Sequence, residues 1–479
     1  MSRPSFELIS TEQVARILDE AFALLAHTGV RVSLPEARAL LASGGAAVDE
    51  NAEVVRLPEA LIRAGLQSAP HSFTLYNLLG EARLTYGDDQ VHFDPGSAAV
   101  NVLDADSGRQ RPAQSADLLR IIQVAEGLPQ FAAQSTAVVC ADIPVPIGDL
   151  YRLYLVLLHS AKPVITGAFT AEGGQRMLRF LAGVCGGAQA LRERPVAVFD
   201  VCPTPPLVYS AFAAQSLIDL ARAGVPAEIV SMPLAGSAGP VTLLGSVVQH
   251  AAECLAGIAL HQCAAPGAPI VWGGAPAIFD MRHGTTPMGA VETAMMDAAY
   301  AQVGRSLGLP THTYLAASDA KLVDAQAGLE SGISAVLAAL AGVSMVSGAG
   351  MLDFLNCHSA EKLVVDAEAV RAALRLREGM HELTPTLGLE FFVGIDFRAD
   401  FLKQKVTRQL FRAEQSLPSA VIDRGSVRAW EESGRLDTWA RARLRVEELV
   451  AAYTPPDLPP AQAQELRERM AAEQKAVSA

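Results

Sequence analysis

Between residues 130 and 350, short apolar runs alternate with longer amphipathic stretches. Such runs are typical of strands in a parallel sheet that helices cover on both faces. The repeated order of strand and then helix predicts an α/β fold, and the number of units favours a (β/α)8 TIM barrel. The predicted strands are 132–140, 163–169, 195–203, 227–234, 268–276, 310–318 and 343–350, with the eighth placed at "LGLEFFVG", 387–394.

A doubly wound open sheet is the alternative architecture. It is disfavoured because no G-x-G-x-x-G motif follows the first strand. The pattern of hydrophobic and polar positions changes before and after the strand–helix region. These changes divide the chain into four parts. We predict an N-terminal helical cap (1–70), a small antiparallel β segment (71–115), the barrel domain (116–415) and a C-terminal helical arm (416–479) that contributes to contacts between subunits of a homo-oligomer.

Composition narrows the class of protein. The 479-residue chain is 50% hydrophobic and 19% charged, which indicates a globular protein, and its net charge of −13 disfavours nucleic acid and anionic membrane surfaces as partners. The N-terminus lacks the apolar core of a signal peptide, and the apolar stretch 335–352 carries Gly and Ser residues that fit a buried helix and strand. Six cysteines without a C-x-x-C pair are typical of a reduced, cytoplasmic enzyme.

In a TIM barrel, functional groups come from the C-terminal ends of the strands and the loops that follow them. Aromatic residues and acids alternate at these positions, and together they would suit a quaternary ammonium cation. Capping of the core by the aromatic residues, and ion pairing between loops by the acids, are the competing interpretations. The candidates are Asp200, Tyr209, Trp272, Phe279, Asp280, Arg282, His283, Tyr314, Asp319 and Glu330.

Small residues at the same ends predict room above the barrel for a wide ligand. Gly236 lies in "MPLAGSAGP", and Gly273 and Gly274 lie in "WGGAP". Gly96, in the antiparallel segment, would allow close approach of a backbone or a ligand. These four glycines are the predicted contacts to a cofactor, together with Asp353.

The stretch "MLDFLNCHSAEKLVVD" (351–366) places Cys357 beside His358 after the seventh predicted strand. No third group completes a catalytic triad there, so a nucleophilic thiol is disfavoured. We interpret Asp353, Phe354, Asn356 and His358 instead as lining the barrel mouth or a docking surface. Ser359 is the predicted N-cap of the following helix.

A second cluster invites a metal interpretation. His250, Glu253, Cys254 and His261 share one face of a predicted helix, but that face also carries apolar residues and lies outside the barrel. A satisfied buried polar cluster is therefore the favoured interpretation, and we predict no tightly bound metal. The sequence contains no G-x-S-x-G, H-E-x-x-H or P-loop motif, which excludes the corresponding hydrolases and nucleotide triphosphatases.

Several stretches together resemble the trimethylamine:corrinoid methyltransferase superfamily over nearly the whole chain. They are "APHSFTLYN", "LYRLYLVLLHSAKPVITGAFT", "MPLAGSAGPVTLLG", "SDAKLVDAQAGLE", "GAGMLD" and "EKLVVDAE". The superfamily members named for trimethylamine contain pyrrolysine, which this sequence lacks, so the chain is similar to the non-pyrrolysine branch associated with quaternary amines such as glycine betaine.

The resemblance implies a (β/α)8 barrel that transfers a methyl group from a small methylated amine to the cobalt of a corrinoid (cobalamin) carried by a separate protein docked over the mouth. Arg282 or His283 would then hold a substrate carboxylate. Asp200, Asp280, Asp319 or Glu330 would face the cation. Two alternatives remain: a methyltransferase of the same fold that uses a sulfonium or a methylated heterocycle, and a catalytically silent barrel that serves as a scaffold.

Overall fold

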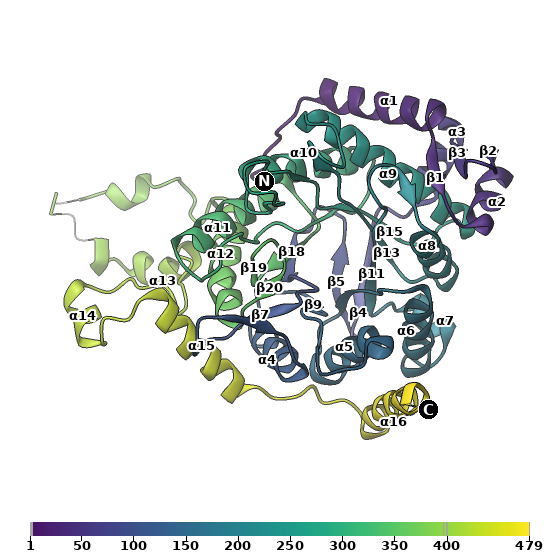
Figure 1. The fold of residues 1–479 in the computed structure, drawn as a ribbon. Coiled ribbons are helices and arrows are strands. Elements are labelled where there is room, and N and C mark those ends of the chain that lie inside the picture. Colours follow the sequence, from purple (N-terminus) through teal and green to yellow (C-terminus); the bar gives the residue numbers. More distant parts are fainter. Residues whose placement is uncertain (1–2, 396, 399–400, 479) are drawn as a thin grey trace.

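Parallel strands surrounded by helices occupy the centre of the molecule (Figure 1). The structure is a computed structural model that describes residues 3–395, 397–398 and 401–478. Within these residues the central strands pair in two parallel ladders, of order β9-β10-β11-β13-β15 and β17-β18-β6. The fold is therefore mixed α/β and TIM-barrel-like. These eight strands are β6 (His92–Pro95), β9 (Gln134–Ser135), β10 (Val164–Gly167), β11 (Ala197–Val201), β13 (Ala227–Ser231), β15 (Ile270–Gly274), β17 (His312–Thr313) and β18 (Met345–Ala349).

The two ladders approach each other at two seams without forming one continuous ladder. At the first seam, Trp272 of β15 forms an isolated bridge with Thr311, just before β17. At the second, the N–H of Ala132 donates to the carbonyl of Phe93 in β6 at 2.9 Å. Each of the seven strands predicted between 132 and 350 contains an observed strand, so the predicted order of strands and helices is confirmed there, whereas the described ladders do not close a barrel.

The prediction of the eighth strand is wrong. Residues 387–394 contain only a 3-10 turn, η1 (Leu389–Phe392), with no buried residue. The eighth parallel strand is β6, which pairs with β18 through His92–Met345 and Phe93–Val346. A strand of four residues that includes Asp94 and Pro95 lacks the apolar run by which the other strands were recognised. The segment 71–115 therefore contributes one strand to the central arrangement.

The other strands of that segment pair with one another in antiparallel hairpins. β4 (Phe73–Tyr76) pairs with β5 (Ala82–Tyr86), and β7 (Asn101–Leu103) pairs with β8 (Gln110–Pro112). The β4–β5 hairpin lies at the N-terminal ends of the central strands, where the N–H of Tyr76 donates to the Pro195 carbonyl. Its side chains complete an apolar layer inside the strands, which closes this end of the interior: Leu75, Leu84, Tyr86, Ala133, Ile165, Val198, Val271 and Met345.

Helices cover the outer faces of the central strands (Figure 1). Outward-facing strand residues such as Phe199, Ile229 and Val346 pack into the main core with them. Alternation of inward and outward side chains along each strand produces this separation into two layers. The helices are α4 (Ser115–Glu126), α5 (Val145–His159), α6 (Ala171–Val184), α7 (Ala188–Glu193), α8 (Ala211–Ala223), α9 (Leu243–Ala264), α10 (Val291–Ser306), α11 (Ala325–Ala341) and α12 (Ala360–Glu378).

The N-terminal segment is a mixed helix–strand cap. Its elements are α1 (Thr11–His27), β1 (Val30–Val32), α2 (Pro35–Ser43), β2 (Ala47–Asp49), β3 (Val54–Arg56) and α3 (Glu59–Ser68). A capping box at Ser10–Gln13 begins α1, whereas α2 begins after Leu34 without a side-chain cap. The three strands join β12 (Val208–Tyr209) in a sheet of order β12-β1-β3-β2. The segment is therefore not purely helical.

Helix α9 is buried on nearly all sides because α1, α2 and α3 pack on its outer face. Among the described residues it is the one helix that is long and apolar enough to cross a membrane by length and composition. However, 78% of its most apolar window is buried inside the protein. Its apolar character is therefore explained by the cap that covers it.

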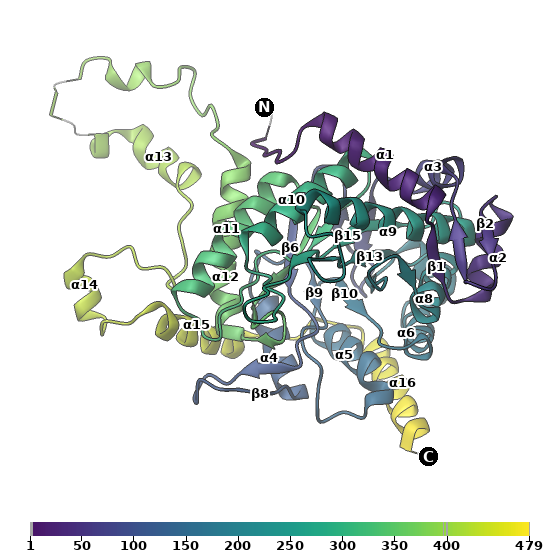
Figure 2. The same cartoon turned by 45° about the horizontal axis from the view of Figure 1, so that its top comes forward.

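Short strands and a protruding segment complete the fold. The loops after the central strands contain β14 (Leu234–Ala235), β16 (Ala277–Ile278), β19 (Met351–Leu352) and β20 (Cys357–His358). The C-terminal elements are η2 (Phe401–Lys403), α13 (Lys405–Glu414), α14 (Val427–Glu432), α15 (Thr438–Ala452) and α16 (Pro460–Ser478). Helix α15 packs on α12 and α4, and α16 on α5, whereas α13 stands away from the body (Figures 1 and 2).

Candidate functional site

Beyond the apolar layer, the inward positions of the central strands are polar. Asp200 follows the inward-facing Val198 by two positions, and Ser347 follows Met345 in the same way. Because side chains alternate across a strand, both point into the same interior. Asp94, Glu228 and His312 join them from β6, β13 and β17. We call Asp94, Asp200, Glu228, His312, Tyr314 and Ser347 the interior acidic layer.

The members of this layer contact one another across strands. The hydroxyl of Ser347 donates to Asp94 Oδ1 at 2.5 Å, and the hydroxyl of Tyr314 donates to Asp200 Oδ2 at 2.8 Å. His312 Nδ1 lies 2.7 Å from Glu228 Oε1. Gly273 makes room for that pair, since a Cβ there would lie 3.0 Å from Glu228 Cγ and 3.3 Å from His312 Nδ1.

Burial disfavours negative charge in this layer. It raises the pKa of Asp94 and of Asp200, and the neighbouring Glu228 raises both further. Burial also raises the pKa of Glu228 to about 8, although contacts with Asp200 and Tyr86 oppose the shift. The pKa of His312 falls to about 4 for the same reason. The three carboxyl groups are therefore difficult to ionise together unless a positive charge enters with them.

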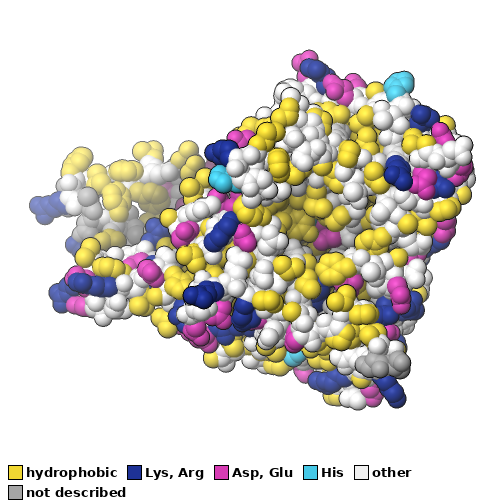
Figure 3. Space-filling model, viewed as in Figure 1, with side chains coloured by type: hydrophobic (Ala, Val, Ile, Leu, Met, Phe, Trp, Pro, Cys, Tyr) yellow, Lys and Arg dark blue, Asp and Glu magenta, His cyan; other side chains and the backbone are white. Residues whose placement is uncertain are grey.

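One side of the layer is accessible. Asp94, Glu228 and His312 are fully buried, whereas Asp200 is half-buried and Tyr314 is slightly exposed. Figure 3 shows a hollow over the central strands, walled mainly by hydrophobic side chains, with acidic atoms inside it. Asp94 Oδ2 and His312 Nε2 lack a hydrogen-bond partner among the described residues. A cation with apolar substituents would match both the walls and the acidic floor.

Replacing Tyr314 by Phe should weaken cation binding without unfolding the protein. The Tyr314 hydroxyl stabilises the carboxylate form of Asp200, so its removal should raise the pKa of Asp200 further. We expect KM for a cationic substrate to rise about 5- to 10-fold, which corresponds to the roughly 1 kcal/mol of one hydrogen bond, with Tm unchanged. Steady-state kinetics and thermal unfolding measure the two effects, and an unaltered KM would contradict the role given to Tyr314.

Three of the predicted site residues lie in or directly beside this layer. Asp200 and Tyr314 belong to it, and Gly273 shapes it. The other predicted residues lie outside the layer, either in the loops that follow the strands or on the outward faces of the strands.

The loop after β15 and β16 forms a local ionic cluster. Arg282 donates to both carboxylate oxygens of Asp280, at 3.0 and 2.6 Å, and His283 Nδ1 lies 3.3 Å from Asp280 Oδ2. These contacts hold the pKa of Asp280 below its usual range. Arg282 and His283 are exposed, and Phe279 is half-buried beside them. Gly236 lies in the turn after β14, with φ of 95°.

Asp319 and Glu330 organise the loop after β17. Asp319 accepts hydrogen bonds from the N–H groups of Met288 and Gly289 at 2.8 and 3.0 Å, and Glu330 accepts from Ser318 Oγ and the Asp319 N–H. Burial raises the pKa of Asp319 to about 6. Both acids thus hold neighbouring segments together through hydrogen bonds, not through the ion pairs of the competing interpretation.

The stretch that contains Cys357 and His358 forms a tight turn at the same face. Asp353, Phe354 and Leu355 have φ of 50°, 58° and 66°, in the left-handed region. Lys321 stabilises the turn through an ion pair and a cation–π contact: its Nζ lies 3.1 Å from Asp353 Oδ1 and 3.8 Å from the centre of the Phe354 ring. The side chain of Asn356 is exposed.

The adjacent thiol and imidazole are buried. Burial raises the pKa of Cys357 to about 12 and lowers that of His358 to about 3, so the thiol has little thiolate character and the imidazole is neutral at neutral pH. His358 therefore packs inside the fold, unlike the mouth position predicted for it. Gly96 is also packed, since a Cβ there would meet the Met351 side chain.

Trp272, Tyr209 and Gly274 point away from the interior. Trp272 is fully buried between β15 and helices α9 and α10, and its Nε1 donates to the Tyr300 carbonyl at 3.0 Å. The hydroxyl of Tyr209 donates to the Glu253 carbonyl of α9 at 2.7 Å. A Cβ on Gly274 would meet His250 of α9. This placement contradicts the prediction that Trp272 lines the substrate site, because outward positions of these strands face the helices.

The cluster on α9 is a buried polar cluster. His250 Nε2 lies 3.0 Å from the Gly273 carbonyl, and Cys254 Sγ lies 3.5 Å from the same oxygen. Glu253 accepts from the Leu207 N–H, Ser231 and Gln249. Burial lowers the pKa of both His250 and His261 to about 3. Within the residues that the structure describes, no group of three or more His, Cys, Asp or Glu has an arrangement that could hold a metal ion.

Four residues of the interior layer are not among the predicted site residues: Asp94, Glu228, His312 and Ser347. A signal was present for Glu228, which interrupts the apolar run Ala227–Val230, and for His312, which lies two positions before the predicted residue Tyr314 and so shares its face of the strand. A buried strand that carries a charge at an inward position indicates a functional interior. The predicted site residues lie at strand ends, whereas these side chains lie deeper along the strands, at alternating inward positions.

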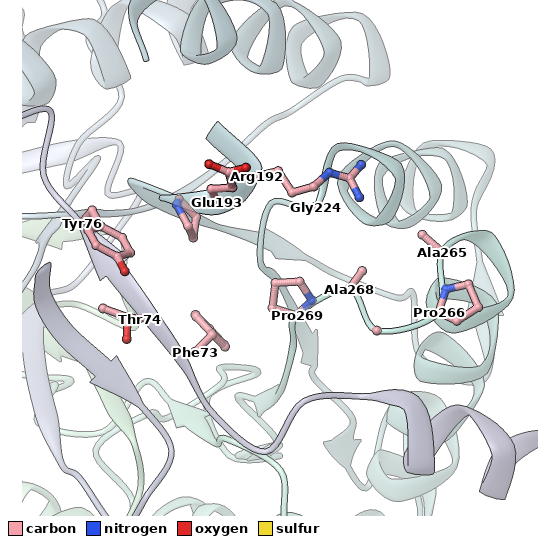
Figure 4. Close-up of a pocket in the computed structure, with 12 residues that line it drawn as sticks. Phe73, Thr74, Tyr76, Arg192, Glu193, Gly224, Ala265, Pro266, Ala268 and Pro269 are labelled. Carbon is pink, nitrogen blue, oxygen red and sulfur yellow. The ribbon is translucent and has the colours of Figure 1, made fainter. Parts of the chain in front are cut away.

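A separate cleft of about 380 Å³ opens at the N-terminal end of the strands (Figure 4). Its lining comes from β4 and from the segments before β11 and β15, and includes Phe73, Tyr76, Glu193 and Pro269. None of the predicted site residues lines it. Because catalytic groups of TIM-barrel-like enzymes gather at the opposite, C-terminal strand ends, this cleft is not the candidate site.

Comparisons with known proteins extend over nearly the whole chain. The family model described as "Trimethylamine methyltransferase (MTTB)" matches residues 1–478. The trimethylamine methyltransferase MttB2 of Methanosarcina mazei is 31% identical over 489 residues, covering 98% of this chain and 95% of its own. The glycine betaine methyltransferase of Desulfitobacterium hafniense (strain Y51) is 30% identical, covering 95% of each chain. Among solved structures, the Methanosarcina barkeri monomethylamine methyltransferase matches with a TM-score of 0.55 at 12% identity, over 92% of this chain and 89% of its own, which supports the fold.

Proposed function

The chain belongs to the trimethylamine methyltransferase (MTTB) family and is a methyl-transferring enzyme, and on this premise we propose that its methyl donor is a betaine-type quaternary amine. The proposed acceptor is Co(I) of a corrinoid carried by a separate protein that docks over the C-terminal strand ends. The observation that carries the proposal is the interior acidic layer, which combines Asp200 at its accessible side with an apolar surround.

Two features favour a quaternary amine over trimethylamine. The sequence contains no pyrrolysine, the residue associated with the trimethylamine branch. A quaternary nitrogen also keeps its positive charge at every pH, so it can stabilise the ionised form of Asp200 permanently. The named activity of the glycine betaine relative agrees with a donor of this class.

Methyl transfer from a quaternary amine requires this chain mainly to bind and align the substrate. The corrinoid of the partner protein would supply the nucleophile, and the C–N bonding pair would stay on the nitrogen of the departing tertiary amine, so this chain would need to provide neither a general acid nor a nucleophile. The residues of the chain hold the cation opposite Asp200, orient the N–CH₃ bond and exclude water.

The carboxylate of a betaine would point toward the rim. Arg282, His283 and Lys321 all lie on loops after β15 and β17, the strands on either side of the first seam between the ladders. Arg282 and Lys321 are paired with Asp280 and Asp353. Both cations remain partly exposed, so a substrate carboxylate can share them.

The surface around the strand ends fits a docked protein. Exposed apolar side chains follow successive central strands at this face: Val100, Val145, Phe169, Met232, Val241, Met281, Val291 and Leu322. Isolated exposed apolar residues are ordinary, but a set distributed around one opening is typical of an interaction site. The proposed corrinoid protein would cover these residues and bring its cofactor over the hollow.

We place the activity in the cytoplasm. The six cysteines are all free thiols, as expected in a reducing compartment.

Methyl transfer to a reduced corrinoid protein tests the proposal. The purified chain is mixed with a Co(I) corrinoid protein and, in turn, glycine betaine, proline betaine, carnitine, trimethylamine, a dimethylsulfonium compound or a methylated heterocycle. We expect a betaine to yield the methylated corrinoid, seen by absorbance, and the matching tertiary amine, seen by mass spectrometry. Transfer only from the sulfonium or heterocycle, or from no compound, would contradict the proposal.

Cation binding should strengthen with rising pH, and Glu228 should account for part of this dependence. Its pKa near 8 keeps it protonated at neutral pH, and a bound cation favours the charged form. We therefore expect kcat/KM for the amine to increase as pH rises toward about 8. Glu228→Gln should flatten that rise, as measured by pH profiles of the two proteins. Identical profiles would exclude Glu228.

A further inference from the structure

The segment 380–415 extends from the body without a core of its own (Figure 2). We call it the arm; it precedes the C-terminal helical segment predicted for 416–479. It contains five phenylalanines, at 391, 392, 397, 401 and 411, and several leucines. Nevertheless, none of its described residues is buried. Met380, Leu387 and Phe397 are each about nine-tenths exposed, at 91%, 89% and 89%. A segment this apolar is stable in water only when something covers it.

Helix α11 presents a complementary uncovered face. Leu329 and Ile333, one turn apart, are more than half exposed, and a Cβ added at Gly328 or Gly332 would meet no atom. The only charged residue of α11 is Glu330, which is turned toward Ser318 and Asp319 at the mouth. Helices on the surface of a protein usually carry a polar outer face, so this one also lacks a partner.

We propose that the arm of one copy of this chain packs on α11 of a second copy, and reciprocally, in a two-fold dimer. In Figures 1 and 2 the arm leaves the body on the flank where α11 and α12 lie. Since the arm and α11 share this flank, a single two-fold axis brings each arm onto the other α11. The proposal is independent of the methyl donor.

The size of the exposed surface agrees with an interface between copies. The arm's most exposed large side chains are Met380, Leu387, Leu389, Phe392, Val393, Phe397 and Leu402. At roughly 150 Å² or less for each, they expose on the order of 800 Å². A standard interface buries about 800 Å² on each partner.

The composition of the arm favours a second copy as the occupant. Between residues 380 and 415 five acids balance five Lys or Arg residues, so the arm has no net charge although the chain as a whole carries −13. Contacts of this arm are therefore mainly apolar, which is typical of permanent interfaces between identical subunits.

Sedimentation of the full-length protein tests this interface. The wild-type chain should sediment at twice its mass of 50.4 kDa at micromolar concentration. The double variant Leu387→Asp/Leu389→Asp and the variant Ile333→Glu should each sediment as monomers. The matched control is Leu79→Asp, which places the same charge on an exposed leucine in the β4–β5 turn, and it should remain dimeric.

Each other outcome overturns the proposal. A monomeric wild-type chain would do so directly, and so would arm and α11 variants that remain dimeric. If the arm variants stay dimeric but lose methyl transfer to the corrinoid protein, the arm contacts that partner instead. Circular dichroism and Tm of each variant verify that loss of the dimer does not follow from unfolding, because all three substituted side chains are already exposed.

Discussion

Replacing Asp200 by Asn lowers kcat/KM for the quaternary amine about 100-fold, while the protein remains folded. Asn keeps the shape of the side chain and can accept the hydrogen bond from Tyr314, but it lacks the charge that faces the cation. Loss of one charge opposite a buried cation costs about 3 kcal/mol or more, which corresponds to this factor. Steady-state methyl-transfer kinetics measure it.

The same variant should be at least as stable as the wild type. The folded-state pKa of Asp200 lies well above its ordinary value of 3.8. Ionisation therefore opposes folding increasingly as pH rises above that value, and Asn removes this cost. Asp219→Asn, on the outer surface of α8, is the matched control and should change kcat/KM less than about 2-fold. Equal kinetics for Asp200→Asn and wild type would remove Asp200 from the site.

Trp272→Ala should be among the most destabilising single changes in the chain, lowering the free energy of unfolding by about 3–5 kcal/mol. The side chain is fully buried between β15 and helices α9 and α10. Its loss leaves a cavity there and removes the hydrogen bond from Nε1 to the Tyr300 carbonyl. Urea denaturation followed by circular dichroism measures the effect.

Trp272→Phe provides the graded control for this position. It retains an aromatic ring and loses only the hydrogen bond and part of the volume, so we expect a loss of about 1–2 kcal/mol. If Trp272→Ala instead raised KM with unchanged stability, the residue would line the substrate site after all, and its outward orientation on β15 would be contradicted.

Trp272 illustrates what sequence patterns resolve and what they leave open. The apolar run around it correctly predicts a buried strand, because burial on both faces requires apolar side chains in succession. The same run gives no indication of which alternate residues face the interior and which face the helices. An aromatic residue near a strand end is then assigned to the mouth by its position alone. A shift of one residue along the strand decides whether its side chain faces the interior or the helices.

The interior acidic layer illustrates the opposite error. Asp200 was found because it lies near a strand end, and Tyr314 because it follows one. Asp94 was missed together with its strand, since β6 is short and polar. Its place beside β18 depends on pairing across about 250 residues, between His92 and Met345, which local patterns do not contain. The family resemblance identified the reaction class, but not these residues.

Binding of the active quaternary amine and of its neutral carbon isostere tests the central claim most directly. For glycine betaine the isostere is 3,3-dimethylbutanoate, which has the same shape and carboxylate but no positive charge. Calorimetric titration into the wild-type chain should show the amine binding at least about 10-fold more tightly, with the difference lost in Asp200→Asn. Equal affinities for the amine and its isostere would contradict recognition of the cation by the interior acidic layer.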